Sequence, residues 1–353
     1  MTLRAWAELL RVSALFTVPG DALAGAASRG LRPDRGTALA LGSSLCLYEA
    51  GMALNDWADR EEDAIDRPHR PIPSGRITPG AALLAAGALT AAGLTLASSA
   101  GRRPLALATA LAATVWSYDL HFKHTRLGPA AMATARGLDL LLGAVATGGG
   151  GEARALRRGA GEQPCAVRLG AAGTSGAPGA PGAPGAPGVA GVAGASGVAV
   201  PAGVGTALSA AGMLAAHTYA VTSVSRHETQ GGSTLVPLGA LAATLGLAAA
   251  TLREHRGTGG SPPVAGRGGP GELSRIVGIA LAGAYVRTAG TPLLHAALNP
   301  SPPLTQRAVG GGIRAMIPLQ AALAARAGGS ATALAVMGLV PLARKLARKV
   351  SPT

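Results

Sequence analysis

The residues best suited to chemistry lie between Asn55 and Arg76, where a long apolar segment ends. Four aspartates there follow the spacing i, i+3, i+7 and i+10: Asp56, Asp59, Asp63 and Asp66. On a helix continued from the apolar segment, this spacing places all four carboxylates on one face. Such a stripe would oppose the helix unless cations compensate it. Mg²⁺ prefers carboxylate oxygens and shares its other positions with water and substrate phosphates.

Four arginines lie among these acids or just after them: Arg60, Arg67, Arg70 and Arg76. Guanidinium donors are suited to phosphate oxygens. Acids and arginines together therefore predict a metal-diphosphate site. The alternative is a solvated charged loop that ends a helix. The regular spacing, the proline-rich exit and the position at the edge of an apolar segment favour the metal-diphosphate site.

The composition of the chain indicates a helical membrane protein. Of 353 residues, 48% are hydrophobic, 14% are charged and only 3% are aromatic. A soluble core of this size would lack large side chains, whereas closely packed membrane helices favour small residues. The net charge of +14 is spread over many loops, with no basic face carrying aromatics. Nucleic-acid binding is therefore not predicted, and Cys46 and Cys165 indicate neither a disulfide framework nor a zinc site.

Nine or ten apolar stretches are long enough to cross about 30 Å of hydrocarbon. They run over 8–27, 37–58, 79–99, 103–121, 127–148, 200–225, 234–252, 272–293, 306–327 and a short 330–343. We therefore predict an all-α, multi-pass bundle of about nine transmembrane helices in the cell membrane. Charges inside these spans are costly and are expected to be paired or to lie nearer the interface. They are Asp21, Glu49, Arg136, Asp139, His217, Arg287 and Arg314.

The predicted transmembrane domain is divided in two by a segment of low complexity. Its first part is 1–148 and its second part is 200–343, followed by a basic tail at 344–353. Between them, 149–199 contains Gly-Ala-Pro triplets and then glycine at every third position. A collagen helix needs three chains and a longer run, so we interpret this insert as a linker.

Two further groups of polar residues are predicted to lie at the aspartate end of the bundle. Lys123 follows the fourth span, where it suits either a phosphate or the membrane interface. Near the end of the sixth span, Tyr219, Ser223 and His227 recur every four residues and share a helix face. An even number of spans separates each group from the aspartate stripe. All three groups should therefore emerge on one side of the membrane.

The aspartate motif resembles a known family. Asn55-Asp56-x-x-Asp59-x-x-x-Asp63 with Arg67-Pro68-x-Arg70-Pro71-Ile72-x-x-Gly75 is similar to the first aspartate-rich motif of the UbiA superfamily of intramembrane prenyltransferases. Tyr118 and Lys123 match its Tyr-and-Lys loop, and 231–237 resembles its Gly-x-x-Thr-Leu-Pro run. The second motif and the region from Asn299 also resemble the EboC-type subgroup.

The resemblance implies a nine-helix, Mg²⁺-dependent prenyltransferase that moves an isoprenyl group from an allylic diphosphate to an aromatic or other small lipophilic acceptor. The implied metal ligands are Asn55, Asp56, Asp59 and Asp63. The implied catalytic residues are Asp56, Asp59 and Lys123. The implied substrate-binding residues are Asn55, Arg67, Arg70, Tyr118, Lys123, Tyr219, Ser223, His227 and Glu228.

The second motif departs from the family pattern. Family members usually carry Asp-x-x-x-Asp there, whereas this chain has Ser223 and His227, with Glu228 as the nearby carboxylate. A non-catalytic binder or transporter of isoprenoid diphosphates is therefore the alternative function. An ion-coupled transporter would predict an inverted repeat, and none is visible. The distribution of basic residues would place the motifs outside, whereas the resemblance implies the cytoplasmic side.

Overall fold

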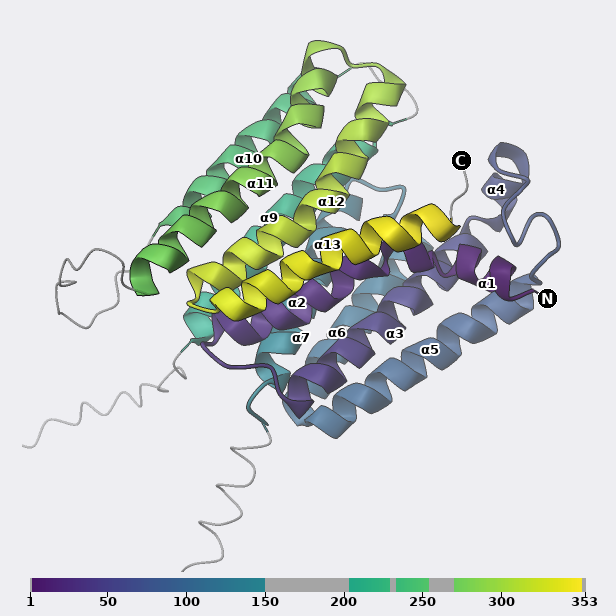
Figure 1. The fold of residues 1–353 in the computed structure, drawn as a ribbon. Coiled ribbons are helices and arrows are strands. Elements are labelled where there is room, and N and C mark those ends of the chain that lie inside the picture. Colours follow the sequence, from purple (N-terminus) through teal and green to yellow (C-terminus); the bar gives the residue numbers. More distant parts are fainter. Residues whose placement is uncertain (1, 150–202, 229–232, 254–269, 351–353) are drawn as a thin grey trace, which may run out of the picture.

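The computed structural model describes residues 2–149, 203–228, 233–253 and 270–350 (Figure 1). The regular elements in these ranges are helices, which confirms the all-α prediction. They are α1 (Leu3–Leu9), η1 (Val12–Thr17), α2 (Val18–Ser28), α3 (Arg35–Ala58), α4 (Arg60–Asp66), α5 (Pro79–Ala100), α6 (Arg102–Ser117), η2 (Tyr118–Phe122), α7 (Gly128–Ala146), α9 (Val204–Ser225), α10 (Leu235–Leu252), α11 (Pro270–Leu298), α12 (Pro302–Arg326) and α13 (Ser330–Val350). Apart from Gly149, the predicted insert 149–199 lies outside the described residues.

Within the described ranges, five helices are long and apolar enough to cross a membrane. They are α3, α5, α10, the part of α11 from Arg275 to Leu298, and α12. The other predicted spans also form helices, several of them shorter. The prediction of a polytopic helical membrane protein is confirmed by this arrangement.

The first predicted span, 8–27, is broken into α1, η1 and α2. Arg11 caps η1 with a φ of 47°, the one positive φ among the non-glycine residues described. This left-handed conformation costs an L-residue about 1–2 kcal/mol. Pro19, in the first turn of α2, has no N–H to continue a helix from the preceding turn. The N-terminal segment therefore bends twice and does not cross as one straight helix.

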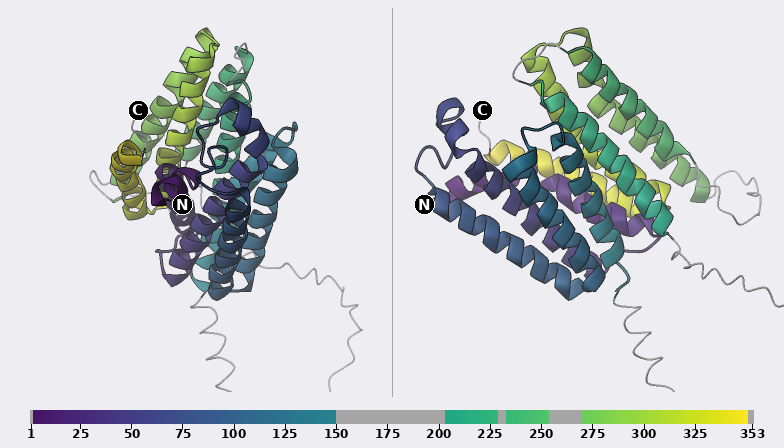
Figure 2. Two further views of the ribbon diagram at one scale, coloured as in Figure 1. Left: turned by 90° about the vertical axis from the view of Figure 1, so that its right-hand side faces the viewer. Right: turned by 180° about the vertical axis from the view of Figure 1, so that it is seen from behind.

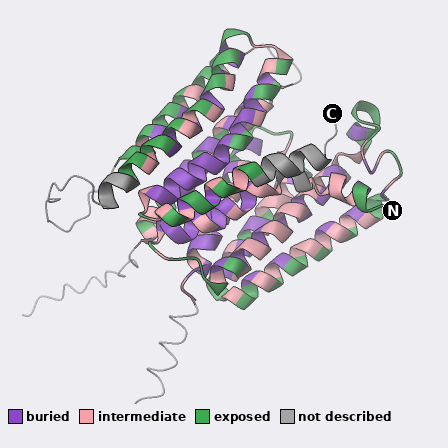
Figure 3. Ribbon diagram, in the orientation of Figure 1, coloured by how far each residue is buried: buried purple, intermediate pink, exposed green. Residues whose placement is uncertain are grey.

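The helices form two groups that meet along a shared seam (Figures 1 and 2). One group contains α2, α3, α5, α6 and α7, and the other contains α9, α10, α11 and α12. The groups pack together where α7 meets α9 and where α2 meets α12. Figure 3 shows that α12 is largely buried, and 83% of its most apolar window is inside the protein, against 22% for α5. The α12 helix is therefore central, and α5 lies at the periphery.

Small residues allow α2 and α7 to approach closely. A Cβ atom added to Gly143 would lie 2.4 Å from the Cα atom of Ala22. A Cβ atom added to Gly25 would lie 2.2 Å from the backbone oxygen of Leu140. Each helix thus places a glycine against the backbone of the other. Close backbone approach at small residues is the usual way in which membrane helices gain packing contact.

Gly143→Ala is therefore expected to destabilise the protein by about 1–3 kcal/mol, the usual cost of overpacking a tight contact. A lower melting temperature of the purified protein in detergent would report this loss. Gly212→Ala on α9 is the matched control, because a Cβ atom there would have nothing within 4 Å. An equal melting temperature for the two variants would contradict the close approach of α2 and α7.

The second group of helices is joined by a buried polar contact. The Nδ1 atom of His217 on α9 lies 2.9 Å from the Tyr285 hydroxyl on α11. Its Nε2 atom lies 3.0 Å from the Gly312 carbonyl on α12. Both side chains are almost fully buried. His217, predicted as a charge to be explained within a span, therefore has a structural role between three helices.

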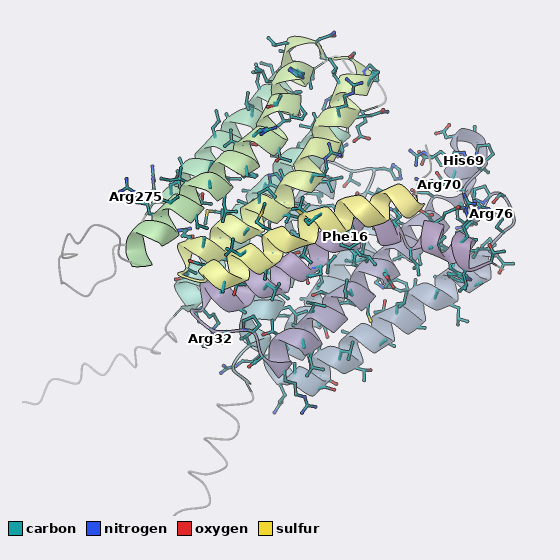
Figure 4. All side chains as sticks on the ribbon, in the orientation of Figure 1. Phe16, Arg32, His69, Arg70, Arg76 and Arg275 are labelled. Carbon is teal, nitrogen blue, oxygen red and sulfur yellow. The ribbon has the colours of Figure 1, made fainter. Side chains whose placement is uncertain are left out.

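The proline-rich segment after α4 is fastened to the protein on both sides of Arg70. Ile72 and Ile77 are buried in a cluster with residues of α1, α3 and α5. The Arg76 guanidinium donates to Glu8 on α1 at 2.6 Å and to the His69 carbonyl at 2.7 Å. Figure 4 labels His69, Arg70 and Arg76 together at the end of the molecule that carries α4. These contacts hold the backbone near Arg70 in place.

Candidate functional site

The aspartates lie on two helices that meet at Asp59. Helix α3 ends at Ala58, Asp59 caps it, and α4 begins at Arg60. The expected single helix is therefore interrupted, although the Asp59 N–H still donates to the Asn55 carbonyl at 3.0 Å. Asp63 on α4 nevertheless lies near Asp56 on α3, because both carboxylates form an ion pair with Arg70. Asp66, the last member of the predicted stripe, is exposed at the end of α4.

Two of the aspartates share one arginine. The Nη1 atom of Arg70 lies 3.3 Å from Asp56 and 2.7 Å from Asp63. Arg11 adds a 3.1 Å ion pair to Asp56, and Arg67 adds one of 3.4 Å to Asp63. The Asp56 and Asp63 side chains are only 6% and 3% exposed. Burial of two carboxylates is tolerated here because three guanidinium groups compensate their charge.

The third aspartate meets the loop that follows α6. Lys123, just beyond η2, forms an ion pair with Asp59. One helical turn before Asp59, the Asn55 amide donates a hydrogen bond to the Asp119 carboxylate at 3.0 Å. The structure thus brings Asn55, Asp59 and Lys123 together from segments 64 residues apart. Asp59 also lies near Glu62 and His124, whose ligand atoms fall within 4.8 Å of one another.

A cavity of about 380 Å³ adjoins this cluster, although Asp56, Asp59 and Asp63 are not among its lining residues. Near the aspartate end it is lined by Arg11, Asn55, Tyr118 and Asp119. Most of the remaining surface is apolar, with Leu47, Met52, Leu111, Val115 and Ile313 among the lining residues. The cavity lies between the two groups of helices, since α3, α6 and α7 line one side and α9 and α12 line the other. An apolar chain with a charged head could be accommodated in this arrangement.

The end of α9 lies near the aspartate cluster, as the parity of the spans predicts. The Arg226 guanidinium donates to the Thr125 carbonyl in the loop after η2. Glu228 is close enough to Arg67 for the guanidinium to act on its carboxyl. Burial raises the pKa of the Glu228 carboxyl, and Arg67 opposes part of this rise.

The predicted face of α9 is not the face that lines the cavity. Tyr219 is 49% exposed, the Ser223 hydroxyl donates to the Tyr219 carbonyl at 2.8 Å, and a ring nitrogen of His227 lies 3.2 Å from the Ser223 carbonyl. The cavity is instead lined from α9 by Thr218, Val221, Thr222 and Ser225. The two faces are adjacent around the helix. The binding roles of Tyr219, Ser223, His227 and Glu228 remain predictions.

Two variants of α9 would show which of these faces meets a metal-diphosphate ligand. Ser223→Asp combined with His227→Asp is expected to tighten Mg²⁺-dependent diphosphate binding about tenfold, because hard oxygen ligands are added. Ser225→Asp, on the cavity face, is the matched comparison. Isothermal titration with Mg²⁺ and a prenyl diphosphate measures both. If only Ser225→Asp tightens binding, the cavity face of α9 is the face that contacts the ligand. If neither variant changes the affinity, α9 does not contribute to the metal-diphosphate site.

Two residues in the cluster were not among the predicted site residues. Arg11 lies inside an apolar run, and its charge at that depth was the available signal. Its strained backbone directs the guanidinium to Asp56. Asp119 follows Tyr118 directly, and its carboxylate accepts from Asn55. Its part in the cluster follows from the π-helical turn of η2, which the sequence pattern does not reveal.

Comparisons with known proteins agree with the fold and the motif. Residues 13–159 match the UbiA prenyltransferase family. The digeranylgeranylglyceryl phosphate synthase of Methanopyrus kandleri is 37% identical over 130 residues, 35% of this chain and 46% of the relative. That of Ignicoccus hospitalis is 36% identical over 158 residues, 44% of this chain and 52% of the relative. The matches thus span about half the length of these relatives.

The structural similarity extends over nearly the whole chain. A UbiA homolog from Archaeoglobus fulgidus, solved with GPP and Mg²⁺, superposes with a TM-score of 0.53 at 17% identity. The superposition covers 95% of this chain and 99% of that structure. At this level of identity the superposition shows a shared fold, a polytopic bundle of membrane helices. The sequence similarity to the UbiA prenyltransferase family is confined to residues 13–159, less than half of the chain.

Proposed function

We propose that the protein is a Mg²⁺-dependent intramembrane prenyltransferase that moves an isoprenyl group from an allylic diphosphate to a small acceptor. The observation that carries the proposal is the cluster of Asp56, Asp59 and Asp63, each held by a cationic side chain. Arg11, which pairs with Asp56, also lines the adjoining apolar cavity. Sequence similarity to prenyltransferases over the same residues supports it. The solved homolog with GPP and Mg²⁺ shares the fold.

The residues present fit Mg²⁺. Carboxylate oxygens of Asp56, Asp59 and Asp63 and the amide oxygen of Asn55 form a set of hard donors, which is the set that Mg²⁺ prefers. When bound, Mg²⁺ would stabilise negative charge that develops on the diphosphate. The arginines and Lys123 now compensate the aspartates. If Mg²⁺ took their place on the carboxylates, these cations would be available to bind the diphosphate oxygens.

The reaction divides between the mouth and the interior of the cavity. Arg67, Arg70 and Lys123 would hold the diphosphate through charge-assisted hydrogen bonds as the allylic C–O bond breaks. The apolar wall, which includes Leu47, Met52 and Val115, excludes water that would otherwise capture the allylic cation. The acceptor then forms the new bond to the allylic carbon and loses one proton. Diphosphate is the other product.

The acceptor is the open part of this proposal. The named relatives are digeranylgeranylglyceryl phosphate synthases, so a glycerophosphate-type acceptor is one candidate. The family resemblance of the motifs implies an aromatic or other small lipophilic acceptor. The apolar lining near Leu111 and Ile313 suits the lipophilic part of either class.

A second function, binding without turnover, is favoured by one observation. Ser223 and His227 stand where the family usually has aspartates, so this part of the chain offers fewer carboxylate ligands for a second metal ion. Incubating the purified protein with labelled prenyl diphosphate, Mg²⁺ and pooled acceptors separates the two functions. Prenylated product that disappears with EDTA supports the enzyme. Tight Mg²⁺-dependent binding with no product would establish the binder in its place.

A further inference from the structure

The amide of Asn55 is the one neutral ligand in the proposed metal set, and its two ends differ in chemistry. Mg²⁺ binds oxygen ligands, whereas the NH₂ group of an amide only donates hydrogen bonds. Half a turn about the last side-chain bond exchanges the two ends. An Asn55 side chain that is free to rotate would therefore present the wrong end to the metal for part of the time.

The carboxylate of Asp119 decides which end of the amide faces it. The Nδ2 atom of Asn55 donates to the Oδ1 atom of Asp119 at 3.0 Å. An ionised carboxylate can only accept, so the NH₂ group must face Asp119 and the amide oxygen must face away. Among the described residues, this oxygen has no hydrogen-bond donor of its own. Asn55 also lines the cavity, so its oxygen is available to a ligand.

Asp119 is held in register with α3 by its neighbours on both sides. Contacts between α3 and the segment 115–123 recur every four residues. They join Gly51 to Val115, Asn55 to Asp119 and Asp59 to Lys123. The Lys123 N–H also donates to the Tyr118 carbonyl at 2.9 Å, which closes the π-helical turn that carries Asp119. The carboxylate is therefore fixed relative to α3 on both sides of Asn55.

The burial of Asp119 indicates that its charge has a use. The residue is only 7% exposed. Lys123 of the same segment pairs with Asp59, and Asp119 forms no ion pair in the part of the chain that the structure describes. A buried carboxylate without a cationic partner is costly. A neutral side chain would join the two segments at lower cost, but it would not accept hydrogen bonds without also being able to donate them or lacking an acceptor altogether.

We propose that Asp119 is a positioning residue that holds the Asn55 amide with its oxygen, and not its NH₂ group, presented to Mg²⁺. This rests on the proposed function, because it takes Asn55 to be a ligand of that metal. In this role Asp119 contacts neither the metal nor the diphosphate. It acts through the NH₂ group of a ligand, and partners of this kind are typically worth about 10–100-fold in metal affinity.

Asp119→Asn and Asp119→Leu form a matched pair that separates orientation from charge. Both variants remove the same charge, and both side chains are close to aspartate in size. The introduced asparagine keeps an oxygen that can accept from Asn55, whereas leucine has no acceptor. We expect Asp119→Leu to bind geranyl diphosphate at fixed Mg²⁺ about tenfold more weakly than Asp119→Asn. Isothermal titration of the full chain in nanodiscs measures both affinities.

The same pair in an Asn55→Ala background is the control. No amide is left to orient there, so the two variants should bind within about twofold of each other. A tenfold difference that persists without Asn55 would mean that residue 119 acts on the ligand directly, and it would overturn the proposal. Equal affinities of the two variants in the presence of Asn55 would overturn it as well.

The unaltered protein offers a second test, which holds even if a variant fails to fold. Asn55 and Asn299 are the two asparagines of the chain, so ¹⁵N-asparagine labelling gives two side-chain amide signals. The exposed Asn299 is the reference for fast exchange with water. We expect the Asn55 NH₂ protons to exchange more slowly and to stay protected when Mg²⁺ and geranyl diphosphate bind. Faster exchange on binding would show that the bond to Asp119 breaks, which contradicts the positioning role.

The outcome is separable from that of the proposed function, because neither measurement involves turnover. If the two variants differ as expected but no prenylated product forms with any acceptor, prenyl transfer fails and the positioning role stands. If product forms but the two variants bind equally, prenyl transfer stands and the positioning role fails. Absence of Mg²⁺-dependent binding by the unaltered protein would overturn the metal site and this role together.

Discussion

Asp59→Asn is expected to lower Mg²⁺-dependent turnover of a prenyl diphosphate by about 10²–10³-fold, the usual loss when a group that stabilises transition-state charge is removed. Asp59 joins α3 to α4 and pairs with Lys123. Its loss would therefore remove a proposed metal ligand and also release the lysine that would hold the diphosphate. Turnover of labelled prenyl diphosphate at saturating Mg²⁺ measures the effect.

Glu61→Gln is the matched control for this experiment. Glu61 is a carboxylate in the first turn of α4, its side chain is 86% exposed, and its partner is Arg60. We expect its turnover to remain within twofold of the unaltered protein. If Asp59→Asn also stays within twofold, the metal is not held at this end of α3.

Arg136→Met is expected to destabilise the fold by about 3–5 kcal/mol, because it leaves the carboxylates of Asp21 and Asp139 buried without a positive partner. The side chain of Asp21 is fully buried and that of Arg136 is only 13% exposed, so water cannot screen the loss. Unfolding in mixed detergent, followed by circular dichroism, measures the change. Adding Asp21→Asn to Arg136→Met should restore part of the stability.

Arg287→Met provides the comparison for this second prediction. Arg287 is exposed near the middle of α11, and no ion pair holds it within the described residues. Its replacement should leave stability unchanged or slightly increased, as expected for an apolar residue at the protein surface in lipid. A similar loss in both variants would mean that the Arg136–Asp21 pair carries no special stabilisation.

The sequence predicted best the bounds of the long apolar helices. The spans 37–58 and 79–99 match α3 and α5 almost to the residue, because long apolar runs between polar ends allow few alternatives. The aspartate motif also placed Asn55, Asp59 and Lys123 in one cluster through the parity of the spans. These predictions depend on the length and hydropathy of each segment, which can be read from the sequence without knowing how the helices pack.

Other features depend on tertiary packing and could not be predicted. The first span reads as one apolar run, yet Arg11 turns out of it to meet Asp56, a partner 45 residues away. On α9, residues four apart give a face through Tyr219 and Ser223, whereas packing against α7 and α12 points the adjacent face to the cavity. A period of 3.6 cannot distinguish two faces about 100° apart when both are polar.

The anchored segment after α4 has a consequence for the speed of substrate capture. Ile72 and Ile77 are held in the core and Arg76 is tied to Glu8, so the backbone around Arg70 has little freedom to swing. Arg70 can still exchange Asp56 and Asp63 for phosphate oxygens by turning about its side-chain bonds. Rotamer changes of this kind take picoseconds to nanoseconds, whereas loop opening extends to microseconds. Association with a prenyl diphosphate should therefore be limited by its arrival through the membrane interface, and viscosity of the medium should slow it in direct proportion.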